Sequence, residues 1–199
     1  MKHGFAAKYG FTLIEMLIVV LIIAILSAIA VPNFLEQQIR AKVSKAKVDM
    51  RTLVTGLEAY NADNNSYPID YDEEYGTSIG WVFNDFESWK QLTTPQAYIS
   101  TVPYSPFLIQ GRDHHNPYDP QQEVYIYWGP ASHNPQRWAD ISAYFAIVCA
   151  GPDNDRDFYE DIIDDLCAKQ PLGMNSLYDP TNGTISNGDV IWTGHGLHN

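Results

Sequence analysis

An uninterrupted apolar stretch from Phe11 to Val31 constrains this chain more than any other feature. Its only polar side chains are Thr12, Glu15 and Ser27. A helix of this length, at about 1.5 Å per residue, is about 30 Å long, which matches the hydrocarbon core of a bilayer. The stretch is therefore predicted to be a single transmembrane helix.

The segment before the apolar stretch is short, carries positive charge on Lys2 and Lys8, and ends in Gly10. A secretory signal peptide is cut after its apolar region, whereas the small residue here precedes that region. Cleavage after Gly10 would keep the hydrophobic helix in the mature protein. Residues 1–10 are therefore predicted to be a leader peptide, and residues 11–32 the first part of the mature chain.

Glu15 is an acid within the apolar stretch. A carboxylate at the centre of a membrane helix costs about 2.5 to 3.5 kcal/mol on insertion scales, so a partner is expected. Cleavage after Gly10 would create an ammonium group on Phe11, four residues before Glu15. The two charges could then neutralise each other, within one chain or between neighbouring copies. The alternative is a glutamate that is merely tolerated near the end of the span.

The charge of the chain is divided unevenly. Residues 1–51 hold seven of the 12 basic residues and three of the 24 acids, so residues 52–199 carry five basic and 21 acidic side chains. Hydrophobic residues make up 45% of the chain, which is typical of a folded protein. A basic stalk is thus joined to an acidic head, and so acidic a chain is not expected to bind nucleic acid.

The helix is predicted to continue beyond Pro32, through residues 33–63. Apolar positions there recur at steps of three and four, as in an amphipathic helix, at Leu35, Ile39, Val43, Ala46, Met50, Leu53, Val54, Leu57 and Tyr60. Pro32 lacks a backbone donor, so a kink or local melting is expected near residues 28–32. Asn and Asp residues before Pro68 supply a stop signal.

A second face of this continuation carries Arg40, Lys47 and Arg51. These cations are expected to contact neighbouring subunits, because the head is acidic. The alternative is a solvated surface, since an exposed ion pair contributes little on its own.

Residues 64–199 alternate short apolar runs with Pro, Gly and Asn clusters, which indicates strands and loops. The best candidate strands are residues 123–128, 141–150 and 189–192, with Thr184 and Ile185 as a possible hairpin arm of the third strand. The apolar stripe of the helix would cover one face of this sheet. The predicted fold is therefore α+β, a ladle-like arrangement of one long helix packed on a small antiparallel sheet.

The segment from Gly10 to Phe34 resembles the class III signal of type IV pilins and type II secretion pseudopilins. The resemblance rests on the charged leader, the Gly-Phe step, Glu15 in the apolar run and Pro32 at its end. It implies that a prepilin peptidase cuts after Gly10 and methylates Phe11, and that Glu15 guides assembly. Residues 41–68, 92–107, 151–157 and 178–191 also resemble major pseudopilins.

This resemblance implies a structural filament subunit, foremost the major pseudopilin of a type II secretion system. The alternatives are a type IV pilin for adhesion or motility, and a membrane-anchored carbohydrate-binding module. The implied partners are further copies of the chain, the prepilin peptidase, an inner-membrane assembly platform with its ATPase, minor pilins or pseudopilins, and membrane lipid before assembly. The precursor would be a single-pass protein of the bacterial inner membrane with its head in the periplasm, and would then enter a periplasmic pseudopilus or a surface filament.

Seven carboxylates fall within the 13 residues from Asp153 to Asp165. They repel one another unless they are solvated or bridged by a cation, and hard oxygen ligands favour calcium. The resemblance to major pseudopilins implies calcium at the Gly151-Pro152-Asp153 step. The candidate ligands are Asp153, Asp155, Asp157 and Asp161, and the alternative is a solvated acidic loop.

The two cysteines of the chain, Cys149 and Cys167, bracket this acidic segment. In an oxidising compartment such a pair often forms a disulfide, and two free thiols are the alternative. The sequence contains no nucleophile elbow, phosphate-binding loop or dinucleotide fingerprint, and its histidines lack metalloprotease spacing. The chain is therefore not expected to be an enzyme.

Overall fold

The computed structural model describes residues 10–69, 85–107, 124–129, 145–154, 177–179, 181, 186, 188–194 and 196–198. It divides into two compact units, Met1–Gln38 and Ile39–Asn199. The first unit contains the beginning of a long helix. The second contains the rest of that helix, together with a short helix and a sheet.

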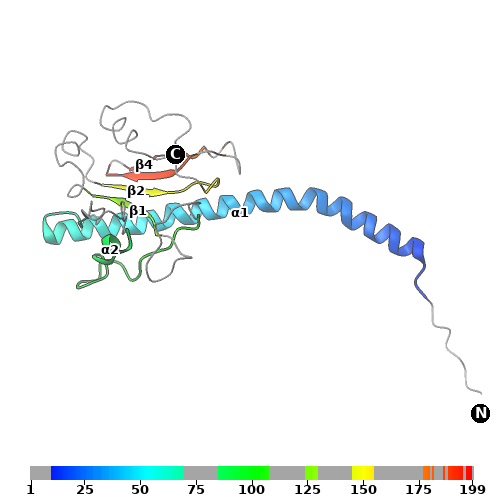
Figure 1. Ribbon diagram of the computed structural model, residues 1–199, viewed down its shortest axis with the longest axis horizontal. Coiled ribbons are helices and arrows are strands. Elements are labelled where there is room, and N and C mark those ends of the chain that lie inside the picture. The colour runs from blue at the N-terminus through cyan, green and yellow to red at the C-terminus, as the bar shows by residue number, and fades with distance from the viewer. Residues whose placement is uncertain are drawn as a thin grey trace, which may run out of the picture. The chain divides into compact units, whose positions relative to one another are not determined.

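The long helix, α1, covers Leu13–Asn64 and is 52 residues long (Figure 1). Pro32 lies inside it, and residues 28–32 are helical, so the predicted local melting is wrong. Proline removes a single backbone donor, and here the hydrogen bonds on either side maintain the helix. The alternative, a kink, stays a prediction.

The end of α1 agrees with the predicted stop signal. Asn65 adopts a left-handed conformation with φ of 55°, and its N–H donates to the carbonyl of Asn61 at 2.8 Å. The side chain of Asn64 donates to the carbonyl of Tyr60 at 2.9 Å. These bonds satisfy carbonyl groups that the helix end would otherwise leave without partners.

The apolar stripe of α1 is buried within the second unit. Its buried residues are Val43, Ala46, Met50, Leu53, Gly56 and Leu57, whereas Leu35, in the first unit, remains 51% exposed. The three-and-four spacing therefore becomes a core-facing stripe from Ile39, which is partly buried against the core, and its residues are fully buried from Val43 onward.

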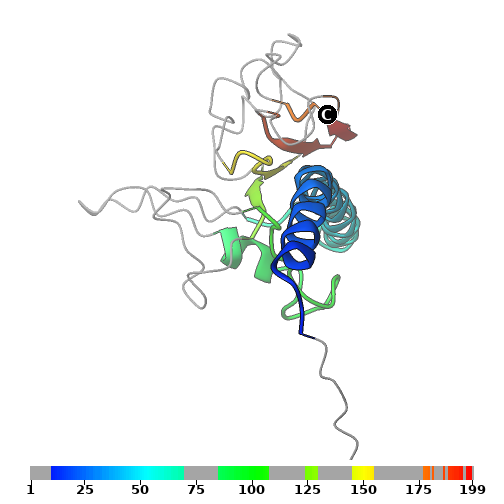
Figure 2. The ribbon, with the colours of Figure 1, turned by 90° about the vertical axis from the view of Figure 1, so that its right-hand side faces the viewer.

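In the part of the head that the structure describes, four short strands form one antiparallel sheet in the order β1-β2-β3-β4. They are β1 Ile126–Trp128, β2 Ala146–Cys149, β3 Val190–Thr193 and β4 Gly196–His198, and a short helix, α2 Asp85–Lys90, contacts β1. Figure 2 shows this sheet beside the C-terminal part of α1. The α+β fold and the three predicted strands are confirmed. β1 and β2 are shorter than predicted, and β3 has the predicted length but begins one residue later.

Two head elements were not predicted. β4 pairs with β3 through Trp192↔Leu197, so β3 forms its hairpin with the strand that follows it. The arm expected at Thr184 and Ile185 lies outside the described residues. The other unpredicted element is α2.

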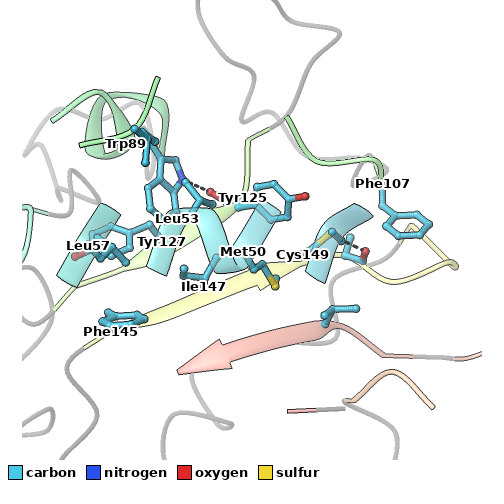
Figure 3. Close-up of a cluster of buried hydrophobic side chains, with 14 of the residues drawn as sticks. Met50, Leu53, Leu57, Trp89, Phe107, Tyr125, Tyr127, Phe145, Ile147 and Cys149 are labelled. Carbon is cyan, nitrogen blue, oxygen red and sulfur yellow. Dashed lines mark hydrogen bonds between the residues drawn. The ribbon is translucent and has the colours of Figure 1, made fainter. Parts of the chain in front are cut away.

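Strands β1 and β2 are buried on both faces. Alternate residues of β1 and β2 and of the segments just before them join α1 in one hydrophobic core, namely Tyr125, Tyr127, Phe145, Ile147 and Cys149 (Figure 3). The intervening side chains, Ile126, Trp128, Ala146 and Val148, are also buried. This period of two is the ordinary pleat of a strand, and it sets which side chains meet the helix.

Candidate functional site

The backbone directly before α1 is exposed and non-helical from Gly10 to Thr12. The predicted cleavage bond, between Gly10 and Phe11, lies in this segment. The bond is therefore exposed, as access by a peptidase requires.

Thr12 and Glu15 form a reciprocal cap at the start of α1. The Glu15 Oε2 atom accepts hydrogen bonds from the backbone N–H of Thr12 at 2.8 Å and from its hydroxyl at 2.6 Å. The backbone N–H of Glu15 donates to Thr12 Oγ1 at 3.3 Å. Because Leu13 is the first helical residue, Thr12 is the N-cap and Glu15 the third helical position, which is a capping box.

This cap was not predicted, although its signal is present in the sequence. A Thr followed three residues later by Glu, directly before an apolar run, is the usual pattern of a capping box. The cap gives the Glu15 carboxylate two donors inside its own chain, in a segment where water is scarce once the helix enters a membrane. The amine of Phe11 stays a predicted additional partner.

The apolar part of α1 is exposed along its length in the single chain. The exposed fractions of its large hydrophobic side chains run from 45% at Val19 to 84% at Leu13. The most apolar window of α1 has a mean hydropathy of 3.0 and no buried residue, so this helix is long and apolar enough to cross a bilayer. Such a surface requires lipid or another apolar partner around it.

Several lysines of α1 contact the head of their own chain. Lys42 Nζ lies 5.7 Å from the ring centre of Phe107, and Lys47 Nζ lies 5.8 Å from that of Tyr178. Burial and then the charge of Arg51 lower the pKa of Lys47. Lys47 therefore packs on the head of its own chain, and its contact with a neighbouring subunit stays a prediction. Arg51 is exposed on the helix surface.

A polar cluster joins α1 to the residue before β1. Asp49 Oδ2 lies 2.6 Å from Lys45 Nζ and accepts a hydrogen bond from the Tyr125 hydroxyl at 2.9 Å. Burial raises the pKa of Tyr125, and the nearby Cys149 and Asp49 raise it further. The hydroxyl therefore stays protonated and acts as the donor. This cluster ties the helix to the sheet at a fixed position.

Asp153 lies in the tight turn that follows β2. The N–H of Asn154 donates to the carbonyl of Gly151 at 3.1 Å, and Asp153 Oδ2 accepts from the N–H of Gly188 at 3.2 Å. Gly188 has φ of 123°, and a Cβ there would lie 2.6 Å from the backbone of Leu177, so only glycine fits. Asp153 thus joins the turn after β2 to the segment that leads into β3.

The structure describes only Asp153 of the four predicted calcium ligands. Asp155, Asp157 and Asp161 fall outside the described residues. Among the residues that the structure does describe, no group of three or more His, Cys, Asp or Glu side chains could hold a metal ion. Asp153 alone does not make a site, and calcium stays a prediction.

Cys149 is a free and buried thiol in the structure. Its sulfur lies 3.3 Å from the Ser105 hydroxyl oxygen and donates to the carbonyl of Ala150 at 3.4 Å. Burial raises the pKa of Cys149 to about 12. Cys167 lies outside the described residues, so the predicted disulfide remains a prediction.

The N-terminal part of the chain is similar to proteins of known families. The family described as the prokaryotic N-terminal methylation motif matches residues 6–31. Over 67 residues the chain is 46% identical to the type IV major pilin protein PilA of Myxococcus xanthus, a match that covers 34% of this chain and 30% of that pilin.

Two further relatives represent a secretion system and a pilus. The type II secretion system core protein G of Pseudomonas aeruginosa is 44% identical over 59 residues, covering 30% of this chain and 42% of the relative. The type IV wide pilus major component PilA4 of Thermus thermophilus is 48% identical over 58 residues, covering 29% and 44%. The chain thus matches less than half the length of each relative, over the N-terminal part. No solved structure matches this chain.

Proposed function

We propose that this chain, which carries the prokaryotic N-terminal methylation motif, is a structural subunit of a type IV pilus-like filament. Within that class we assign it to the major pseudopilin of a type II protein secretion system. The observation that carries the proposal is the capped helix start directly after Gly10-Phe11, followed by an apolar helix that is exposed in the single chain.

The exposed apolar surface of the helix is suited to two environments, first lipid and then other helices. In the precursor its surface would contact membrane lipid, and in the filament the same surface would contact the helices of other copies. Because lipid tails are about as apolar as these side chains, the hydrophobic effect favours neither state strongly. Extraction then requires external work, which is the role we assign to an inner-membrane assembly platform with its ATPase.

The helix start supports processing by a prepilin peptidase. The Gly10–Phe11 bond is accessible, and cleavage would place a new amine, to be methylated, four residues before Glu15. The cap by Thr12 already holds the Glu15 carboxylate at the N-terminal end of α1. From there the carboxylate could reach the Phe11 amine of its own chain or of an adjacent copy.

The location follows from the same features. The precursor would cross the bacterial inner membrane once, with its head in the periplasm, and the assembled form would be a periplasmic pseudopilus. Minor pseudopilins are the expected partners at the filament tip. The role is structural, without catalysis.

A type IV pilin of an extracellular filament is the second candidate. It is favoured by the similarity to the major pilins of Myxococcus xanthus and Thermus thermophilus, which covers 34% and 29% of the chain, against 30% for the secretion protein of Pseudomonas aeruginosa. The two functions differ in where the filament ends. Deletion of the gene should abolish protein export if the chain is a pseudopilin, whereas loss of surface fibres with normal export would favour the pilin.

Calcium and a disulfide in the head are two further proposals. Asp153 places one carboxylate in a tight turn, and the acids that follow it in sequence could add the remaining oxygen ligands that calcium needs. Formation of the Cys149–Cys167 bond would first require that the buried Cys149 sulfur become accessible. It would close a loop that holds the same acidic segment.

One experiment separates the main proposal from an anchored binding module, such as one that binds carbohydrate. Material from intact cells is sheared, sedimented and subjected to N-terminal sequencing. A filament subunit should sediment and begin at a methylated Phe11. A protein that begins at Met1 and remains in the membrane fraction as single copies would contradict the proposal.

A further inference from the structure

Residues Leu92–Phe107, here called the strap, run along α1 in the direction opposite to the helix. At one end, the Tyr98 hydroxyl accepts a hydrogen bond from the side chain of Asn64 at 3.2 Å. At the other end, the carbonyl of Tyr104 accepts from Lys45 Nζ at 3.1 Å, some five helical turns earlier. The strap lies outside the sheet and is held to the helix by side chains.

The first end of the strap is a closed and well-packed loop. The N–H groups of Tyr98 and Ile99 both donate to the carbonyl of Leu92, at 2.8 and 3.2 Å. Ile99 is buried against Gly56 of α1, where an added Cβ would lie 2.7 Å from Ile99 Cγ2. A glycine inside a helix costs about 1 kcal/mol relative to alanine, and here it permits this close approach.

The second end of the strap is held differently. Tyr104 is 39% exposed and forms a single isolated bridge to Val124. Its carbonyl is bonded by Lys45, whose side chain is 55% exposed. Phe107 is the fully buried side chain of the strap at this end, with Lys42 over its ring, and Val102 is partly buried against the core. Segments with few buried contacts and exposed hydrogen bonds open at lower free energy than the core.

The second end covers the Cys149 thiol. The Ser105 hydroxyl oxygen lies 3.3 Å from the Cys149 sulfur and also donates to the carbonyl of Phe107 at 2.7 Å. Cys149 itself is 2% exposed, so reagents reach the sulfur only after something moves. Cys149 itself is the last residue of β2 and part of the hydrophobic core, whereas Ser105 belongs to the strap.

We propose that the strap is a hinged cover. Its Leu92–Ile99 end stays seated on Gly56 while its Tyr104–Phe107 end lifts from α1, and Lys45 is the latch that keeps the lifted end closed. Lifting exposes the Cys149 thiol without unfolding the sheet. Alkylation of the Cys149 thiol by an added reagent then proceeds through this open form.

The test measures how fast N-ethylmaleimide labels Cys149 in the full chain in detergent, in a Cys167→Ser background so that one thiol remains. Local opening predicts a labelling rate that hardly changes in low urea, because little surface becomes exposed. Lys45→Met, which keeps the apolar stem but removes the hydrogen bond, should raise the rate about tenfold, the size expected for a charged hydrogen bond.

Two control variants separate the latch from general charge effects. Lys90→Met removes an exposed lysine of α2 and should leave the rate unchanged. Asp49→Asn weakens the pair with Lys45 but leaves Lys45 able to bond the carbonyl of Tyr104, so it should raise the rate less than Lys45→Met. The urea midpoint, followed by circular dichroism, shows whether each variant is folded.

The proposal is overturned if wild-type labelling rises with urea as steeply as global unfolding does, or if Lys45→Met and Lys90→Met label at equal rates. Hydrogen exchange of the unmodified chain gives an independent check that needs no variant. The amide of Phe107 should exchange faster than those of Tyr98 and Ile99. Equal exchange at both ends of the strap would also overturn the hinge.

Discussion

The Glu15 carboxylate and Thr12 bond to each other in both directions across the first turn of α1, with Oε2 accepting from the Thr12 N–H at 2.8 Å and Thr12 Oγ1 accepting from the Glu15 N–H at 3.3 Å. Glu15, whose carboxylate is costly to insert into a membrane, is therefore part of the helix cap. A single residue serves helix initiation within the subunit and, in our proposal, charge pairing during assembly.

Substitution at Thr12 tests the cap. Thr12→Ala removes the hydroxyl and should weaken the helix start by about 1 kcal/mol. Hydrogen exchange at residues 13–16 of the full chain in detergent should become faster. Thr12→Ser keeps the hydroxyl and should behave like the wild type, and equal exchange in all three chains would show that the cap is unimportant.

Substitution at Glu15 separates its two roles. Glu15→Gln keeps an oxygen acceptor for the Thr12 N–H but removes the charge, whereas Glu15→Ala removes both. We expect both variants to lose sedimenting filaments, and only Glu15→Ala to accelerate exchange at the helix start. If Glu15→Gln assembles normally, charge pairing with Phe11 is not required. The melting temperature of the head should be unchanged in both, since Glu15 lies in the other unit.

Gly56→Ala tests the close approach of the strap to α1. Alanine has the higher helix propensity, but its Cβ would lie 2.7 Å from Ile99 Cγ2 and 3.3 Å from Leu92 Cδ1. Overpacking of this kind costs about 1 to 3 kcal/mol, so we expect a lower free energy of unfolding in urea. Thr55→Ala, at the exposed neighbouring position, is the matched control and should change stability little. A stabilised Gly56→Ala chain would mean that the strap yields easily.

The buried thiol predicts loss of stability at alkaline pH. The pKa of Cys149 is raised from 9.0 to about 12 in the folded chain. As pH rises, the unfolded chain therefore loses this proton before the folded chain does. The contribution of Cys149 to the free energy of unfolding is unaffected below pH 9 and declines as pH rises from 9 toward 12. Thermal melting across this range should show a steeper decline for the wild type than for Cys149→Ala. Parallel declines would show that another group, such as Tyr125, controls the alkaline limb.

Asp153 predicts a stability effect with two separable parts. Asp153→Ala leaves the N–H of Gly188 without its carboxylate acceptor and should lower the melting temperature even in a chelator. If calcium also binds, adding it should raise the melting temperature of the wild type, and the rise should be smaller in the variant. Magnesium is the control ion. No rise in the wild type would refute the calcium proposal and leave the structural bond intact.

The sequence by itself determined the parts of this protein that depend on local pattern. The apolar run from Phe11 to Val31, the three-and-four spacing after it and the stop before Pro68 predicted one long helix, because helix period and length are properties of neighbouring residues. The three predicted strands were found for the same reason. The capping box could also have been predicted, since Thr12 and Glu15 are three residues apart.

Only the tertiary structure decided the contacts between distant segments. Asp49 accepts a hydrogen bond from Tyr125, which is 76 positions away in the sequence. Gly56 contacts the side chain of Ile99, which lies in a segment without strand or helix periodicity. It also showed that Lys47 packs on Tyr178 inside its own subunit and that Cys149 is covered by Ser105. Such contacts depend on how the chain folds back on itself, so they cannot be predicted from the pattern of neighbouring residues.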